Sequence, residues 1–365
     1  MPPTLTSEPR IGVHLELGRG LRGAAKRAEE IGARTVQVFV DNPTAWKRRG
    51  APPRHLDMFR ERMAALDVAP VAVHASYLVN LAGPEPGFRA SSIEVLASDM
   101  IAAIGYGGRL VNVHTGSHRD TSVAAGIERV ASAAAEVLRR ARQGAKEAAN
   151  RNAGWEVREP MLVLENAAGG GWSVGSSIEE LAQIADRAAA LGVAAGRLGF
   201  CLDVAHAWGA GIAMDDPDAI DAWLEHFDRE LGLARLAMIH FNDSQSERGS
   251  RADRHQHVGA GQIGPRGMGH LLTHPLLRSV PFVLETPGMD RGYDAINLDR
   301  CRALIAGVAL APLPEAAFHM PRRAARSAPA DDDLDRPAAT RGARPQASRA
   351  TRPTRPTRAA SGRRR

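Results

Sequence analysis

The sequence repeats one unit eight times: a short, continuously apolar run followed by a segment with apolar residues at helical spacing. Continuously apolar runs are typical of parallel strands that are buried on both faces. Eight such units between residues 10 and 311 predict one α/β domain, a (β/α)8 barrel. The predicted strands span residues 10–16, 35–40, 70–76, 109–116, 161–166, 198–206, 236–243 and 281–286. The predicted helices span residues 20–32, 55–66, 91–104, 122–149, 177–191, 218–231, 266–277 and 293–308.

An open, doubly wound sheet is the main alternative to this barrel. The barrel is favoured because the count of units closes at eight. In addition, no glycine-rich dinucleotide loop follows the first apolar run, which also argues against a nucleotide cofactor. We expect no second folded domain.

The C-terminus differs in composition from the rest of the chain. Residues 321–365 hold thirteen Arg and four Asp, a net charge of +9, which leaves −3 of the chain's +6 for residues 1–320. This Arg, Pro, Ala-rich segment has too few large apolar residues to offset its ordering entropy. We expect residues 1–9 to be a short extension and residues 312–365 a disordered tail. The tail either binds polyanions such as nucleic acid or is a solvated extension without a function.

Cysteine usage and hydropathy exclude several classes of protein. Cys201 and Cys301 form no CxxC pair, so a disulfide framework and a thiolate zinc site are not expected. The sequence lacks both a signal-peptide pattern and the roughly 18 unbroken apolar residues of a membrane helix. These features predict a cytoplasmic protein without a membrane partner. We also expect a monomer.

Metal-ligating side chains recur at or just after the predicted strand ends. The third to eighth strands each contribute at least one, and the carboxyl ends of barrel strands are where active sites are assembled. The stretch 238–264 is the densest, since it carries the run Asp253, Arg254, His255 beyond a strand that ends at His240. The nine candidate ligands are His74, His114, Glu165, Asp203, His206, His240, Asp253, His255 and Glu285.

Each of these nine residues has an ordinary structural explanation when taken alone. A histidine at an apolar strand end is usually a core residue, a buried acid usually pairs with arginine, and an Asp beside a loop often caps it. Nine such groups at one barrel mouth would repel and desolvate one another without cations. They exceed the ligand number of one zinc ion, about four to six, and suit three ions with one bridging carboxylate. Histidine-rich ligation favours zinc, while manganese or iron is compatible at one or more sites.

These residues lie in segments that resemble, in order, the signatures of the endonuclease IV family. The resemblance covers the chain from about residue 11 to the last predicted helix. The segments are HASYLVNLAGP (74–84), VNVHTGSH (111–118), LVLENAAGGG (162–171), CLDVAHAWGAG (201–211), HFNDSQSERGSRADRHQHVGAGQIG (240–264) and VLETPG (283–288). The family comprises metal-dependent apurinic/apyrimidinic endonucleases of base-excision repair, built on a (β/α)8 barrel with three zinc ions.

The resemblance implies a role for each candidate ligand. One metal would be held by His74, His114 and Glu165, and Glu165 would bridge to a second metal while positioning the attacking hydroxide. The second metal would also bind Asp203, His240 and Glu285, and the third would bind His206, Asp253 and His255. The implied reaction is hydrolysis of the phosphodiester 5′ to an abasic nucleotide in double-stranded DNA. It leaves a 3′-hydroxyl and a 5′-deoxyribose phosphate.

The resemblance also implies DNA contacts, with departures in some loops. Tyr77 and Leu78 match the side chains that enter the gap at the lesion, and His14, Asn42 and Arg254 are further expected contacts. The loop after the second predicted strand, residues 40–50, is called the second loop. In it, Thr44 stands where the family inserts an arginine, and the nearby residues Lys47, Arg48 and Arg49 are candidate substitutes. Glu16, Leu17 and Ala260 also depart from the family pattern. These departures concern DNA geometry and leave the ligand set intact.

Two other functions fit parts of the sequence. Sugar isomerases and epimerases on related barrels also place Glu, Asp and His at strand ends, around one or two metal ions. The third expected site, His206 with Asp253 and His255, has no purpose in such an enzyme. A non-catalytic nucleic-acid binder would use the basic tail but leaves the ligand set unexplained. The sequence therefore favours a nucleoid-associated DNA-repair endonuclease.

Overall fold

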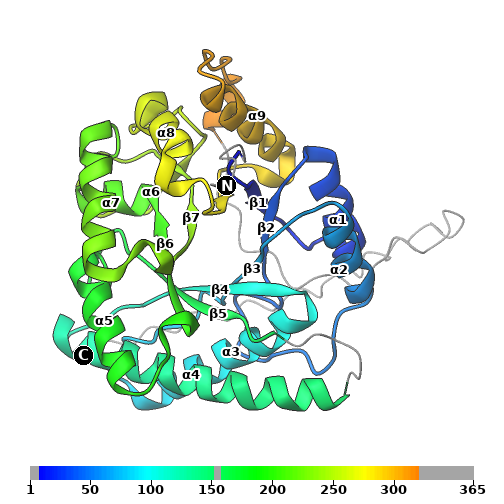
Figure 1. Ribbon diagram of the computed structural model, residues 1–365, viewed down its shortest axis with the longest axis vertical. Coiled ribbons are helices and arrows are strands. Elements are labelled where there is room, and N and C mark those ends of the chain that lie inside the picture. The colour runs from blue at the N-terminus through cyan, green and yellow to red at the C-terminus, as the bar shows by residue number, and fades with distance from the viewer. Residues whose placement is uncertain (1–7, 152–157, 320–365) are drawn as a thin grey trace, which may run out of the picture. The chain divides into compact units, whose positions relative to one another are not determined.

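The computed structural model describes residues 8–151 and 158–319, and its centre is a closed barrel of parallel strands (Figure 1). Each strand pairs with its neighbours along the chain, and β10 closes the ring on β1. This closure confirms the (β/α)8 barrel and excludes the open sheet. The barrel strands are β1 (Ile11–His14), β2 (Thr35–Val38), β3 (Val71–His74), β4 (Gly108–His114), β5 (Met161–Glu165), β6 (Leu198–Asp203), β7 (Leu236–His240) and β10 (Phe282–Leu284).

Helices surround the barrel in chain order (Figure 1). Two of their ends show clear local signals: Ser177 caps α5 by accepting from the Glu180 N–H, and Gly32 ends α1 in the left-handed conformation. The helices are α1 (Gly20–Ile31), α2 (Leu56–Ala65), α3 (Pro86–Gly105), α4 (Val123–Arg151), α5 (Ile178–Ala190), α6 (Val204–Ala210), α7 (Pro217–Leu231), α8 (Gly264–Thr273) and α9 (Tyr293–Ile305). Short 3₁₀ turns lie at Ala195–Arg197, Leu233–Arg235, Pro275–Leu277, Met289–Arg291 and Glu315–Phe318.

The barrel interior contains an apolar layer with a polar layer two residues further along the strands. A small buried cluster separate from the main core comprises Ala72, Leu110, Val163, Cys201, Met238 and Val283. Side chains two apart on a strand share a face, so the positions two residues on also point into the barrel. These positions are His74, Asn112, Glu165, Asp203, His240 and Glu285. The apolar layer thus forms the floor of a polar mouth.

Several boundaries differ by a few residues from those predicted from the sequence, two of them for a clear local reason, and one pair of short strands was not predicted. Helix α3 begins at Pro86 instead of residue 91, because Glu85 caps it and Pro86 occupies the first turn. Strand β6 ends at Asp203 instead of His206, because the Asp203 carboxylate accepts from the His206 N–H at 2.8 Å and starts α6. The loop after β7 contains a short antiparallel pair, β8 (Asp243–Ser244) and β9 (His255–Gln256).

The described part of the chain continues past residue 311, the expected end of the barrel. Ala317 is buried, and its carbonyl lies 3.1 Å from His257 Nε2. The rest of the expected tail, residues 320–365, and residues 1–7 of the expected N-terminal extension lie outside the described residues. Among the helices of the described ranges, none is long and apolar enough to cross a membrane.

Candidate metal centre

All eight barrel strands contribute a polar side chain to the mouth. Strand registers place His14 beside Gln37, His74 beside Asn112, and Asp203 beside His240. The first two strands, from which the sequence predicted no ligand, therefore complete the ring with His14 and Gln37. All the residues of this ring are buried except Glu285, whose side chain is 17% exposed.

Glu165 lies at the centre of the group. Its Oε1 is 3.1 Å from His206 Nδ1 and 3.2 Å from His240 Nδ1, and its Oε2 is 3.9 Å from His114 Nε2. The ring of His74 lies 5.3 Å from that of His114, and the two histidines form with Glu165 one group able to hold a metal ion. Glu165 thus touches histidines from three different elements, which is the position a bridging ligand requires.

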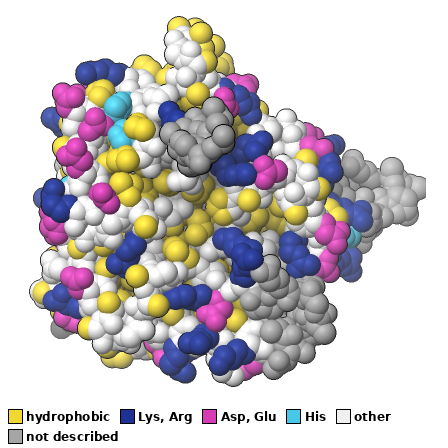
Figure 2. Space-filling view, in the orientation of Figure 1, with side chains coloured by type: hydrophobic (Ala, Val, Ile, Leu, Met, Phe, Trp, Pro, Cys, Tyr) yellow, Lys and Arg dark blue, Asp and Glu magenta, His cyan; other side chains and the backbone are white. Residues whose placement is uncertain are grey.

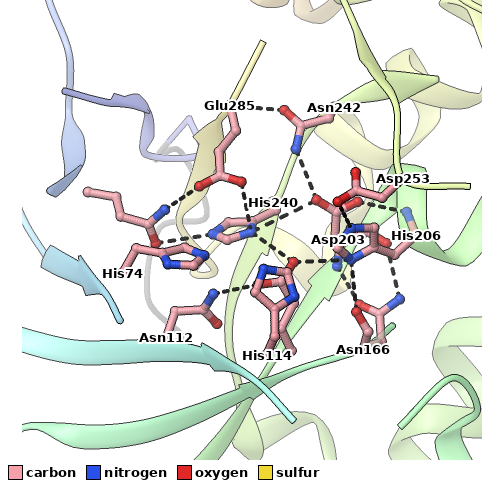
Figure 3. Close-up of polar contacts among 12 residues, drawn as sticks. His74, Asn112, His114, Asn166, Asp203, His206, His240, Asn242, Asp253 and Glu285 are labelled. Atoms are coloured by element: carbon pink, nitrogen blue, oxygen red, sulfur yellow. Dashed lines mark hydrogen bonds and ion pairs between the residues drawn. The ribbon is translucent and has the colours of Figure 1, made fainter. Parts of the chain in front are cut away.

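A second group forms around His240 (Figure 3). Its Nδ1 lies 3.5 Å from Glu285 Oε2 and 3.9 Å from Asp203 Oδ2. Asp203, His240 and Glu285 place one ligand atom each within 4.8 Å of the others. This group adjoins the first, because Glu165 Oε1 also faces His240 Nδ1.

The third group depends on the short pair β8–β9. Its antiparallel register returns the chain to the mouth, where His255 Nε2 lies 3.6 Å from Asp203 Oδ2. Asp253 then links two imidazoles with separate oxygens, at 3.2 Å from His206 Nε2 and 3.1 Å from His255 Nε2. Asp203, His206 and His255 also place one ligand atom each within 4.8 Å of the others, so Asp203 adjoins both the second group and the third.

Backbone and amide contacts orient the imidazoles towards the interior of the group. The outward nitrogens are engaged: His74 Nδ1 lies 2.7 Å from the Ala75 carbonyl, His255 Nδ1 3.1 Å from the Glu285 carbonyl, and His240 Nε2 3.1 Å from Gln37 Oε1. The inward atoms Glu165 Oε1, His240 Nδ1 and His255 Nε2 are buried without a hydrogen-bond partner. Buried polar atoms normally have partners, so inward-facing acceptors of this kind fit divalent cations.

The titration of the metal-free site also fits cations. Burial would lower the pKa of His255, but Asp203 and Asp253 outweigh it and raise the pKa to about 9. Burial would raise the pKa of Glu165, but the imidazoles of His114 and His240 hold it well below its usual range. The carboxylates likewise raise the pKa of His206 and His240, so protons on His206, His240 and His255 balance the carboxylates in the metal-free protein, and bound metal ions would replace those protons.

Three amides that the sequence did not single out hold the carboxylates in place. Asn112 Nδ2 donates to Glu165 Oε2 at 2.5 Å, and Asn242 Nδ2 donates to Asp203 Oδ2 at 2.9 Å. Gln37 Nε2 donates to Glu285 Oε1 at 2.6 Å. Asn242 lies within the HFND segment, while Gln37 and Asn112 could have been found from the two-residue alternation along their strands.

Cys201 lies below Glu165 and His240, and its thiol is close enough to count among their possible metal-binding neighbours. Burial raises the pKa of this thiol to about 12. Cys201 packs in the buried apolar cluster with Ala72, Val163 and Met238, which makes it part of the floor of the mouth.

The expected DNA-contact residues fall into two groups. Tyr77 is 56% exposed, and its ring lies 5.1 Å from that of Phe39 and 5.6 Å from that of His74. Leu78 and Asn42 are half-buried, and Arg254 is exposed on the loop that carries Asp253. His14 differs from these four, because it is buried with Nδ1 3.1 Å from Glu285 Oε1.

The second loop holds two of its three candidate substitutes for the family's arginine in ion pairs. Arg48 Nε lies 3.7 Å from buried Asp99 Oδ1, and Arg49 Nε lies 3.8 Å from Asp41 Oδ1. Thr44 is exposed and turned onto Asn42, with its hydroxyl 2.9 Å from Asn42 Oδ1. Of the three, Lys47 alone has an exposed side chain.

Comparison with known proteins identifies the family to which the chain belongs. The family model described as a xylose isomerase-like TIM barrel matches residues 25–305. The probable endonuclease 4 of Solibacter usitatus is 37% identical over 84% of this chain and 99% of the relative. That of Natranaerobius thermophilus is 34% identical over 81% and 98%. The crystal structure of endonuclease IV from Thermus thermophilus superposes with a TM-score of 0.68 at 36% identity, covering 82% of this chain and all of that one.

Structures named as epimerases share the fold at lower identity. A D-tagatose 3-epimerase-like protein superposes with a TM-score of 0.57 at 16% identity, over 82% of this chain and 100% of the other. This similarity shows the barrel alone. Together with the chain-wide identity to the relatives named endonuclease 4, the site geometry leads to one conclusion: the chain belongs to the endonuclease IV family.

Proposed function

We propose that this protein is an apurinic/apyrimidinic endonuclease that acts on double-stranded DNA. It hydrolyses the phosphodiester 5′ to an abasic nucleotide and leaves a 3′-hydroxyl and a 5′-deoxyribose phosphate. Because its substrate is DNA, the protein acts at the chromosomal DNA of the cell. The reaction uses a cluster of three zinc ions.

The observation that carries this proposal is the set of adjoining ligand groups around Glu165 and Asp203. In the proposed assignment, His74, His114 and Glu165 hold the first ion. Glu165, Asp203, His240 and Glu285 hold the second, and His206, Asp253 and His255 hold the third. Neutral imidazoles are the ligand form, and burial lowers the pKa of His74 to about 4, which keeps it neutral.

The chemistry of phosphodiester hydrolysis needs charge stabilisation and an activated water. Zinc ions supply both when bound, by Lewis-acid polarisation. The protein's part is to hold the ligands: Asn112, Asn242 and Gln37 fix carboxylate oxygens by hydrogen bonds. Tyr77 and Leu78, beside His74, would fill the space left by the missing base, as apolar wedges do in bent duplexes.

The substitution Glu165→Gln tests the proposal most locally. Glutamine keeps the shape of the side chain but removes the negative charge that two cations would share. We expect the variant to lose zinc and to incise an abasic duplex at least roughly 100-fold more slowly. Glu61→Gln, the same change at an exposed position on α2, should leave both quantities unchanged. Incision by Glu165→Gln at the wild-type rate would remove Glu165 from the mechanism.

The same assays separate the endonuclease from a sugar isomerase or epimerase. The third group has a purpose only in a three-ion enzyme, so His255→Ala should remove one ion and abolish incision. An isomerase would keep its activity on sugars in that variant and would show no preference for abasic DNA.

A further inference from the structure

A second cluster of metal-ligating side chains lies on the outer helices, apart from the barrel mouth. Asp221 is on α7, His270 is on α8, and His274 follows α8 at the start of the turn Pro275–Leu277. None of the three belongs to the strands that carry the proposed zinc ligands. Histidine side chains are visible beside carboxylates on the surface over α7 and α8 (Figure 2).

The three side chains converge on one point. His270 Nε2 lies 2.5 Å from Asp221 Oδ1, and His274 Nε2 lies 3.2 Å from the same oxygen. One ligand atom from each residue lies within 4.8 Å of the other two. The ligand atoms of a tetrahedral zinc ion are roughly 3.3 Å apart, given Zn–N bonds of about 2.0–2.1 Å. The separation of His274 from Asp221 is close to this value, whereas the contact of His270 with Asp221 is a hydrogen bond that would lengthen when an ion enters.

Two of the three side chains are open to solvent. The side chain of Asp221 is 45% exposed and that of His270 is 27% exposed, while His274 is nearly buried at 8%. The spacing of four between His270 and His274 sets both imidazoles on one side of the α8 end. A half-exposed site with one buried and two accessible ligands allows an ion to enter without unfolding the helices.

The donor set suits a divalent cation. One carboxylate and two imidazoles are ligands that zinc takes in proteins, and Asp221, His270 and His274 supply them from two neighbouring helices and the turn that follows α8.

We propose that Asp221, His270 and His274 form a peripheral divalent-metal site that takes zinc and joins α7 to α8. It binds its ion independently of the ions at the barrel mouth, because it shares no ligand with them. A bound ion stabilises the folded state in proportion to its affinity, since the two helices bring the ligands together only when folded.

Besides the contacts of the two imidazoles with Asp221, one backbone hydrogen bond changes when zinc binds. The Leu276 N–H donates to His274 Nδ1 at 3.3 Å. Coordination through Nε2 moves the imidazole proton to Nδ1, which then can no longer accept. This distinguishes a zinc site from a purely hydrogen-bonded cluster: saturating zinc should speed amide hydrogen exchange at Leu276 while slowing exchange in α7 and α8.

Zinc content of the full chain, measured after equilibrium dialysis at micromolar free zinc, tests the site. We expect His270→Ala and Asp221→Asn each to bind one ion fewer per chain than the wild type. His226→Ala is the matched control, because His226 is also on α7, is similarly exposed and contacts carboxylates, Glu179 at 3.1 Å and Glu230 at 4.0 Å. The control should bind as many ions as the wild type.

A second readout guards against misfolding of a variant. Zinc added to protein whose mouth site is already filled should raise the unfolding temperature of the wild type and the His226→Ala control. It should not raise that of His270→Ala or of the conservative variant His270→Gln. Equal zinc content and equal temperature shifts in all variants would overturn the proposal, whatever the number of ions at the mouth.

Discussion

Asn112 shows how a residue that binds no metal can govern a metal site. Its amide holds Glu165 Oε2, which leaves Oε1 directed at His206 and His240. Substitution to leucine would remove the donor and leave the carboxylate free to rotate. We expect Asn112→Leu to lower zinc affinity and incision by roughly 10- to 100-fold, measured by competition with a chelating dye and by cleavage of an abasic duplex.

Gln143→Leu is the matched control for this change. Gln143 also donates an amide hydrogen bond to a glutamate, Glu147, but on the exposed face of α4. The Gln143→Leu variant should have the zinc affinity and the incision rate of the wild type. If Asn112→Leu behaves like this control, the amide does not orient Glu165.

The pH dependence of the metal-free protein follows from His255. Its folded-state pKa of about 9 exceeds the ordinary 6.5. A raised folded-state pKa stabilises the fold fully below the unfolded pKa, and the stabilisation is lost as pH rises through the folded pKa. Between pH 6.5 and 8.5, chelator-treated protein should lose roughly 2–3 kcal/mol of unfolding free energy to this group, measured by urea denaturation.

Two comparisons isolate the contribution of His255. Metal-free His255→Gln should show a smaller decrease over the same pH range. Zinc-loaded wild type should show little decrease, because its imidazole is neutral when bound. A metal-free wild type whose stability stays constant or rises from pH 6.5 to 8.5 would contradict the assigned charge pattern.

At the scale of elements, two neighbouring basic residues of the second loop have different roles: Arg48 pairs with a buried carboxylate, and Lys47 is exposed to solvent. Arg48 faces Asp99, whose pKa burial raises to about 7, whereas Lys47 is exposed. Arg48→Ala should destabilise the protein by roughly 1–3 kcal/mol, because it leaves Asp99 buried without its cation. Lys47→Ala should keep stability but weaken DNA binding and reduce the slope of log affinity against log salt by about 1.

Thermal unfolding and salt-dependent DNA binding distinguish the two variants. Thr44→Ala, an uncharged change in the same loop, serves as the control for both measurements. Loss of stability in Lys47→Ala, or an unchanged stability in Arg48→Ala, would show that the ion pair of Arg48 with Asp99 does not stabilise the loop.

The sequence predicted the elements well where a local signal exists. Continuous apolar runs located all eight barrel strands, and the strand-end positions placed the nine candidate ligands at one mouth. His206 was assigned to a strand because VAH continues an apolar run, although the Asp203 carboxylate in fact starts α6 there. The pair β8–β9 was missed, because two-residue strands have no periodicity to detect.

The supporting residues were missed for a different reason. Gln37 acts through Glu285 and His240, which are 248 and 203 residues away in the chain. The two-residue alternation along β2 indicates that Gln37 faces the interior, but only the register of the closed barrel identifies Glu285 and His240 as its partners. The cluster of Asp221 with His270 and His274 likewise depends on the packing of α7 against α8.

At the scale of the whole molecule, the basic tail is the main feature that the structure does not describe. Residues 321–365 carry a net charge of +9 from thirteen Arg and four Asp. Deleting them should weaken non-specific DNA binding and flatten its salt dependence, because fewer counterions are released. Zinc content should not change. Equal binding by the full-length and truncated proteins at low salt would show that the tail plays no part in DNA binding.

The central claim is that the barrel mouth holds three ions and directs them at abasic DNA. Elemental analysis of the purified protein, paired with incision of matched abasic and undamaged duplexes, tests it most directly. We predict three zinc ions per chain at the mouth, counted in the His270→Ala variant to exclude the peripheral site. We also predict cleavage of the abasic duplex alone, with 3′-hydroxyl ends. One ion or none at the mouth, or equal cleavage of both duplexes, would contradict the account.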